Sequence, residues 1–345
     1  MGFSLERVLK VLLIGDIHIK INKLDLSLKF LSWLNKLIRE TKPDIVVNLG
    51  DSLDNHAVIR SEALNELMKH IFTIVDMGIP YVYVKGNHDQ ASPKESDYHA
   101  LLPFKGRIKG LHIVDEVIEL FGITFVPFLG NPAAFPKKTL PICIAHQTFL
   151  GADYGAINAK EGIDGETVEG ADIIISGHIH KKSTIGKVIY VGSPFSQDAS
   201  DINQVKGISV LDTDTLNFKF HPTPLPTWRS FKFELGPGQT IEQLHAALKE
   251  AITGSSDHWV LEVKGPKAEI ISYIDSSQYL KLIAALSIRL KTIFTDKEKK
   301  KASISAVSME HIVAEYINNI YSGSLNKVEL LIQATEILEA VKSTV

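Results

Sequence analysis

The sequence has little of what a secreted or membrane-bound protein needs. Its 345 residues include one cysteine, Cys143, which excludes an internal disulfide framework and a cysteine-based zinc site. The longest apolar runs, such as VLLIG and ADIIISG, are far shorter than the ~20 residues of a membrane helix. The first residues lack the basic, apolar and small-residue order of a signal peptide. We therefore expect a protein of the reducing cytoplasm, with no membrane partner.

The sequence also lacks an excess of positive charge. It has 37 Lys and Arg against 40 Asp and Glu, a net charge of −3. This balance argues against a stand-alone DNA-binding protein, but not against an enzyme whose site is cationic because it holds metal. No Gly-x-x-x-x-Gly-Lys-[Ser/Thr] phosphate loop is present, so an ATP-driven step would need a partner. Composition and length predict a soluble globular protein of about two domains.

The first two thirds of the chain alternates apolar strands with amphipathic helices. Strands are predicted at 11–15, 44–50 and 81–86, separated by helices over 24–38 and about 58–77. Later apolar segments read ITFVPF, PICIAH, ADIIISGH and KVIYVGS. This order predicts an α/β fold with a buried, largely parallel sheet covered by helices and a second sheet packed beside it.

The last third has a different composition. Three prolines within 221–230 mark a boundary, followed by strands SFKFEL and HWVLEVKG and by helices near 239–252 and 276–292. A charged stretch at 295–303 precedes two short amphipathic helices within 308–343. The predicted parts are an α/β domain at 1–222, an α+β module at 223–294, a linker at 295–307 and a helical tail at 308–345.

Polar side chains end five of the predicted strands. They are Asp16 and His18, Asp51 and Asp54, Asn87 and His88, His146, and His178 and His180. Ligands in open α/β sheets gather at the carboxyl ends of strands, so these side chains are expected on one rim. Taken alone, each of these residues is more typical of a turn or of a histidine in the core than of a functional site. Gly86-Asn87, for example, is a common turn sequence. Five strands ending in this way favour one shared site.

The chemistry of this set indicates metal binding. Carboxylate and amide oxygens with imidazole nitrogens suit manganese, iron or zinc rather than calcium. The groups are too many for one tetrahedral ion and about right for two ions bridged by Asp51, whose strand is expected to be central. His88 remains as a protonatable group, and Asp89 is expected to brace the turn. His56 is ambiguous, because it is close enough to Asp54 to approach the rim.

Five short segments of the chain resemble those of a known family. The segments GDIH, GD…D, GNHD, AHQ and GHIH are similar, in order and spacing, to the five blocks of the calcineurin-like metallophosphoesterases, over about residues 8–212. Within that superfamily, AHQTFLGADYG, the segment from YVGSP to GISVLD and the appended module most resemble SbcD-type nuclease subunits of double-strand-break repair complexes, including phage recombination endonucleases. The implied fold is an α/β four-layer sandwich of two mixed β-sheets flanked by helices, with a small α+β capping domain and a C-terminal helical tail.

The resemblance implies a role for each rim residue. One ion would be held by Asp16, His18, Asp51 and His180, and the other by Asp51, Asn87, His146 and His178. His88 would be the catalytic histidine. Asp54 stands where several nuclease members have histidine, and it would orient His88. The implied cofactors are two divalent ions, foremost manganese, with magnesium, iron or zinc as alternatives.

The implied function is a manganese-dependent DNA nuclease acting with an SbcC-like SMC-type ABC ATPase, as a homodimer within a heterotetramer, in a bacterium or a phage-infected host. The tail would dock on the ATPase or fold back on the catalytic domain. Lys297, Lys299, Lys300 and Lys301 would contact DNA or form a solvated linker. The alternative function is a phosphatase or phosphodiesterase acting on a small molecule or protein. A non-catalytic scaffold is disfavoured, because every metal position is filled.

Overall fold

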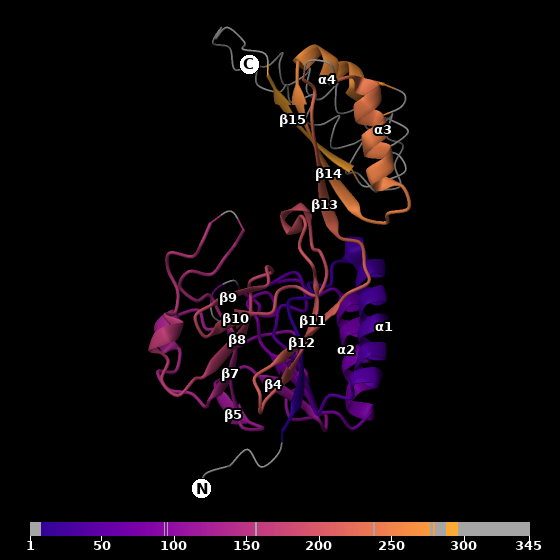
Figure 1. Cartoon of the computed structure of the whole chain (residues 1–345). Coiled ribbons are helices and arrows are strands. Elements are labelled where there is room, and N and C mark those ends of the chain that lie inside the picture. The colour runs from indigo at the N-terminus through magenta and orange to yellow at the C-terminus, as the bar shows by residue number, and fades with distance from the viewer. Residues whose placement is uncertain are drawn as a thin grey trace, which may run out of the picture. The chain divides into compact units, whose positions relative to one another are not determined.

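The computed structural model describes residues 8–295, apart from 93, 95, 156, 237–238, 277–278 and 280–287. These residues form two six-stranded sheets and one three-stranded sheet (Figure 1). The predicted tail at 308–345 and the four linker lysines lie outside the described residues. Among the helices of the described part, none is both long and apolar enough to cross a membrane.

The first sheet carries the N-terminal strands and has the order β12-β11-β1-β2-β3-β4. Four of its strands are parallel, namely β1 (Lys10–Ile14), β2 (Ile45–Asn48), β3 (Tyr81–Val84) and β4 (Leu111–Val114). Strands β11 (Gly207–Asp212) and β12 (Phe218–Pro222) extend it antiparallel beside β1. The whole length of β1, β2 and β3 is near-continuously apolar, because both faces of this sheet are covered.

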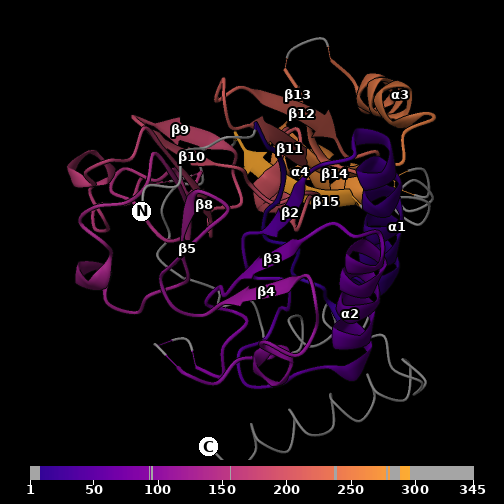
Figure 2. The ribbon, with the colours of Figure 1, turned by 90° about the horizontal axis from the view of Figure 1, so that it is seen from below.

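Two amphipathic helices cover one face of the first sheet. They are α1 (Leu24–Thr41) and α2 (Ser61–Asp76), seen side by side along the sheet in Figures 1 and 2. In α1, Leu31, Leu34 and Ile38 recur at helical spacing and are buried in one core cluster with Leu12 and Tyr81 of the strands. Both predicted helices are confirmed.

The second sheet packs on the other face of the first. Its order is β5-β6-β7-β8-β10-β9. The bounds are β5 (Ile118–Leu120), β6 (Ile123–Val126), β7 (Ile142–His146), β8 (Ile173–Gly177), β9 (Ser183–Ile185) and β10 (Val188–Tyr190). The core between the sheets joins Val47 and Val82 to Ile144 and Ile175. Strands β6, β7, β8 and β10 run parallel, with β5 and β9 antiparallel at the edges, so both sheets are mixed and the predicted α/β architecture is confirmed.

The third sheet belongs to the predicted α+β module. Its parallel strands are β13 (Trp228–Glu234), β14 (His258–Gly265) and β15 (Ile288–Phe294), with helices α3 (Ile241–Ile252) and α4 (Lys267–Ile274) as the connections. Helix α3 begins with a capping box between Thr240 and Gln243.

One expectation for this module is wrong in part. The sequence predicts a helix near 276–292, but residues 288–294 form β15, paired with β14 along its length. Residues 277–278 and 280–287 of the predicted helix lie outside the described residues. From Ile288 to Thr292 half-buried and exposed side chains alternate, which is the period of a strand, whereas Ile293 and Phe294 at its end are both exposed. Helix α4, which the sequence did not predict, begins just after Pro266.

The core between α1 and α2 contains a histidine whose burial predicts acid sensitivity. His70 is fully buried, donates from Nδ1 to Oδ1 of Asn35 at 2.6 Å, and has no hydrogen-bond partner at Nε2. Burial lowers the pKa of His70 to about 4. The unfolded chain therefore binds this proton from about pH 6.5 downward, and the folded chain only near pH 4.

We expect the free energy of unfolding to fall by about 2 kcal/mol between pH 6.5 and pH 5 through His70 alone. Urea unfolding at these two values, in EDTA, measures the change. His70→Phe should lose this part of the pH dependence. An unaltered pH dependence in the variant would show that the destabilisation comes from other groups.

Candidate metal centre

The polar side chains that follow five strands meet at one place. Three groups have candidate ligand atoms within 4.8 Å of one another: Asp16, His18 and His180; His18, Asp51 and His88; and Asp51, His146 and His178. Asn87 lies among them, with Oδ1 close to both His146 and His178. The structure thus brings together every residue predicted to form the rim.

The spacing of these atoms fits shared metal ions. The distance from Nε2 of His18 to Nε2 of His180 is 3.1 Å. Nε2 of His146 lies 3.3 Å from Oδ2 of Asp51 and 3.1 Å from Oδ1 of Asn87. Ligands about 2.1 Å from one ion and at right angles to each other are about 3 Å apart. The donor set therefore has the separations that ion coordination requires.

Asp16 provides an independent sign that a cation belongs here. Its side chain is fully buried, and Oδ1 accepts from the backbone N–H of His178 at 2.8 Å. Oδ2 is buried without a hydrogen-bond partner. Burial raises the pKa of Asp16 above its ordinary value. A buried, unpaired carboxylate oxygen is costly unless a cation lies beside it, so the site fits a metal ion.

Asp51 occupies the central position, after β2. Its Oδ2 lies 3.3 Å from Nε2 of His146 and 3.8 Å from Nε2 of His18, which belong to different groups. Its Oδ1 accepts from the backbone N–H of His88 at 2.7 Å. Burial acts to raise the pKa of Asp51, but the charge and hydrogen bond of His146 and the charge of His18 outweigh it and lower the pKa. The carboxylate is thus ionised and faces both halves of the site.

His146 and His178 differ in protonation. Nδ1 of His146 lies 2.6 Å from the carbonyl oxygen of Leu49, which can only accept, so Nδ1 donates and Nε2 is turned toward the centre. Burial would lower the pKa of His146, but the charge of Asp51 and the hydrogen bond to it raise the pKa to about 9. Burial and the charge of His146 lower the pKa of His178 to about 3. His178 is therefore neutral, which is the form in which an imidazole binds a metal ion.

The backbone of the site is held in conformations that few residues adopt. His18, Asp51 and His178 have φ angles of 46°, 49° and 78°, in the left-handed region. A side chain at Gly86 would place its Cβ 2.2 Å from Oδ1 of Asp51, so only glycine fits there. Gly50, at φ 102°, likewise leaves no room beside Nδ1 of His146. These turns aim the side chains that precede and follow them into the centre.

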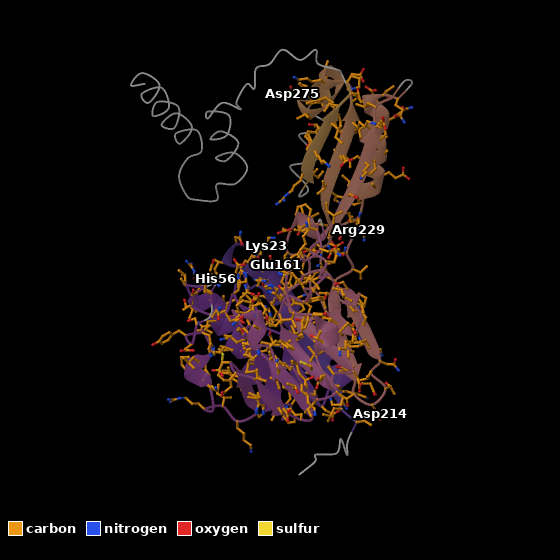
Figure 3. The ribbon with its side chains drawn as sticks, turned by 90° about the vertical axis from the view of Figure 1, so that its left-hand side faces the viewer. Lys23, His56, Glu161, Asp214, Arg229 and Asp275 are labelled. Carbon is orange, nitrogen blue, oxygen red and sulfur yellow. The ribbon has the colours of Figure 1, made fainter. Side chains whose placement is uncertain are left out.

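His88 is held from two sides. Its Nδ1 donates to the backbone carbonyl oxygen of Asp54 at 2.9 Å, and its ring stacks on His56 at 4.5 Å between centroids. Nδ1 of His56 donates in turn to the carbonyl oxygen of Asn87 at 2.7 Å. The sequence left open whether His56 approaches the rim, and these contacts place it there. His56 lies at the same end of the two-sheet body as Lys23 and opposite Asp214 (Figure 3).

The contact between Asp54 and His88 differs from the expected one. The family resemblance implies that the carboxylate of Asp54 orients His88, whereas the structure has the main-chain oxygen do so. Oδ1 of Asp54 lies 3.3 Å from Nζ of Lys20 and 3.7 Å from Nδ1 of His18 instead. The side chain is one third exposed and turns toward Lys20 and the ring of His18. Every residue has a main-chain carbonyl oxygen, so the residue type at position 54 does not predict this contact.

The sequence of the chain matches a known protein family. The family model of the calcineurin-like phosphoesterases matches residues 9–182, which is half of the chain. The chain belongs to the calcineurin-like phosphoesterase family. It is therefore a hydrolase of the phosphoesterase class, and the clusters of candidate ligands agree with the divalent metals that this fold uses.

Three similar proteins differ in how much of this calcineurin-like phosphoesterase they cover. The predicted phosphoesterase 244L of Invertebrate iridescent virus 6 is 29% identical over 59% of this chain and 75% of its own. Exonuclease subunit 1 of Enterobacteria phage T4 is 20% identical over 94% of this chain and 97% of its own. The SbcD subunit of the nuclease SbcCD of Staphylococcus epidermidis is 23% identical over 56% of this chain and 62% of its own.

Asp89 supports the metal centre of this phosphoesterase without facing it. Its buried carboxylate accepts hydrogen bonds from five donors, four on two turns and one on strand β3. They are the backbone N–H groups of Asp51, Ser52, Leu53 and Gly86 and the hydroxyl of Tyr83, at 2.6–3.4 Å. Burial and the charge of Asp51 raise the pKa of Asp89. The predicted bracing role therefore matches its contacts, which tie the Asp51 turn to the Asn87 turn.

We expect Asp89→Asn to lower the free energy of unfolding by about 2–4 kcal/mol, because the amide N–H₂ would face backbone N–H donors. Manganese affinity should fall as well, since the Asp51 turn loosens. Chemical denaturation in EDTA and metal titration measure the two effects. The matched control is Asp164→Asn, at an exposed turn where Oδ1 accepts from Glu166 N at 3.1 Å, with an expected loss of at most about 1 kcal/mol. Equal losses in both variants would contradict the bracing role.

Proposed function

We propose that the protein is a DNA nuclease that hydrolyses phosphodiester bonds with two divalent metal ions, foremost manganese. The observation that carries the proposal is the likeness to exonuclease subunit 1 of phage T4, which spans 94% of this chain and so extends past the family match at residue 182. That span includes the third sheet, β13 to β15. A phosphatase acting on small molecules has no need of such an added module.

The proposed roles follow from the contacts. Asp16, His18, Asp51 and His180 would hold one ion, and Asp51, Asn87, His146 and His178 the other. Two such ions supply an activated water and a clamp on the phosphate. His88 would protonate the leaving oxygen or stabilise the developing charge, because the carbonyl oxygen of Asp54 fixes its ring.

A groove beside the metal centre has room for more substrate than one phosphate. Its volume is about 240 Å³, and its walls include His178 and His180 of the rim with Tyr154, Lys181 and Gln204 further out. Nζ of Lys181 is paired with Asp153 at 2.5 Å. An aromatic ring and a lysine beside a phosphate site are chemistry that single-stranded nucleic acid uses. Tyr154 thus offers a surface on which a base would stack, while Asp153, which also lines the groove, neutralises the charge of Lys181.

The proposal is tested by comparing substrates. With manganese, labelled double- and single-stranded DNA should be cut, and p-nitrophenyl phosphate should turn over far more slowly. EDTA should stop both reactions. Efficient hydrolysis of the monoester with no cleavage of DNA would favour the alternative function, a phosphatase or phosphodiesterase acting on small molecules or proteins.

We further propose that the chain is one subunit of an SbcCD-like complex with an SMC-type ABC ATPase. Two of its relatives are themselves named as subunits, one of the phage T4 exonuclease and one of the nuclease SbcCD. The chain has no phosphate loop of its own, so ATP would be bound by the partner. The partner-binding tail at 308–345 lies outside the described residues and remains a prediction.

A further inference from the structure

The segment at residues 192–206, here named the anchoring segment, lies beyond the family match and contacts two of the ligand turns. A Cβ at Gly15, just before Asp16, would lie 2.1 Å from the carbonyl oxygen of Gly192. A Cβ at Gly192 would in turn lie 2.9 Å from the carbonyl oxygen of His180. Backbone therefore packs directly on backbone at both ends of this contact.

Gln197 reaches the first of these ligand turns. Its side chain is buried, and Nε2 donates to the carbonyl oxygen of Ile17 at 2.9 Å. Ile17 is the residue between the two candidate ligands Asp16 and His18. The backbone carbonyl oxygen of Gln197 accepts from Nζ of Lys23, which fixes the segment from outside.

Lys206 reaches the second ligand turn. Its side chain is buried, and Nζ donates to the carbonyl oxygen of the candidate ligand His180 at 2.6 Å. Nζ also pairs with Oδ1 of buried Asp201 at 2.6 Å, and Oδ2 of Asp201 accepts from the backbone N–H of Gln197 at 2.7 Å. Ser193 N donates to the same His180 oxygen at 3.0 Å. A buried lysine needs such an anion, because an unpaired cation there would be costly and would oppose a metal ion.

The anchored turns carry Asp16, His18 and His180, which form one of the three ligand groups. The second turn also carries His178 of the other group, whose N–H donates to Oδ1 of Asp16. Within the described residues, neither Gln197 nor Lys206 is found in contact with His178, and Asn87 and His146 are held by His56 and Leu49. The direct contacts of Gln197 and Lys206 thus fall on the group of Asp16, His18 and His180.

We propose that Gln197 and Lys206 are positioning residues for one metal ion of the pair, the ion held by Asp16, His18 and His180. Gln197 and Lys206 hold the main chain of these ligands, and Asp201 neutralises Lys206 beside the ion. The inference rests on the proposed dinuclear centre and adds that its two ions depend on separate supports.

Titration of the full chain with manganese(II) tests this. The wild type should bind two ions, detected by calorimetry and by the electron paramagnetic resonance signal of a coupled manganese pair. In Gln197→Met and in Lys206→Met, one ion should bind about tenfold or more weakly and the other with unchanged affinity. At one equivalent of manganese the coupled signal should give way to that of a single ion.

A control variant removes a matched hydrogen bond outside the anchoring segment. Lys187→Met removes the bond from Nζ to the carbonyl oxygen of Val168. That oxygen does not belong to a ligand turn, so the affinities for both ions should stay at the wild-type values. Should Lys206→Met not fold, as circular dichroism would show, Gln197→Met alone decides the inference, because it buries no charge.

The manganese titrations distinguish the selective anchoring from the dinuclear centre on which it rests. Equal weakening of both ions, or unchanged affinity for both in Gln197→Met, would overturn the selective anchoring. A wild-type protein that binds no manganese would overturn the dinuclear centre itself, and the inference with it. Selective loss of one ion in the variants supports the anchoring, whatever substrate the enzyme is found to cleave.

Discussion

Replacing His88 with Ser is expected to slow phosphodiester hydrolysis by about 10²–10⁴-fold while the chain still binds two metal ions. The expectation rests on the contacts of the imidazole. Nδ1 donates to the Asp54 carbonyl oxygen and the ring stacks on His56, so His88 is oriented as a proton donor. Its kcat on DNA and its manganese content by elemental analysis measure the two halves of the prediction.

The metal content decides between two roles for His88. A ring nitrogen of His88 lies within 4.8 Å of candidate ligand atoms of His18 and Asp51, so geometry alone permits ligation. Loss of manganese from the Ser variant would show that His88 is a ligand. His112→Ser, in strand β4 and away from the ligand groups, is the matched control and should retain both activity and metal.

Asp51→Asn is expected to lose both ions, with manganese affinity at least about 100-fold lower. The carboxylate faces His18 in one group and His146 in the other, so its charge is missing from both when Asn replaces it. Stabilisation by manganese should disappear accordingly, which for ligand at 100 times the Kd is about 2.7 kcal/mol. Thermal unfolding with and without manganese measures this.

The contrast with Asp16→Asn sharpens the test. Asp16 belongs to one ligand group, so its variant should weaken one ion and retain the other. Two tightly held ions in Asp51→Asn would contradict the bridging position. A loss of both ions in Asp16→Asn that matches the loss in Asp51→Asn would show that the two sites are not separable.

The rim was predictable because its signal is repeated. Asp16, Asp51, Asn87, His146 and His178 each follow an apolar strand, and the carboxyl ends of parallel strands meet at one edge. The spacing of apolar residues also predicted the main strands and helices of the two-sheet body. Local sequence patterns were thus enough to predict the site, because several strands end in candidate ligands.

Other features depend on contacts between distant residues and could not be predicted in this way. The left-handed φ of His18 has no sequence signal, because only the packed turn imposes it. The contact from His88 to Asp54 uses a main-chain oxygen, so the residue type does not reveal it. Lys206 and Asp201 form a buried pair that reads as ordinary surface charge in the sequence. Strand β15 resembles a helix in the sequence, because its half-buried alternation is weak and its pairing partner β14 is not local.

Anomalous diffraction from crystals grown with manganese tests the central claim most directly. The account predicts two manganese peaks about 3.5–4 Å apart. One should lie beside Asp16, His18 and His180 and the other beside Asn87, His146 and His178, with Asp51 in contact with both. A single peak, or a pair in which His88 is a ligand and Asp51 is not shared, would contradict it.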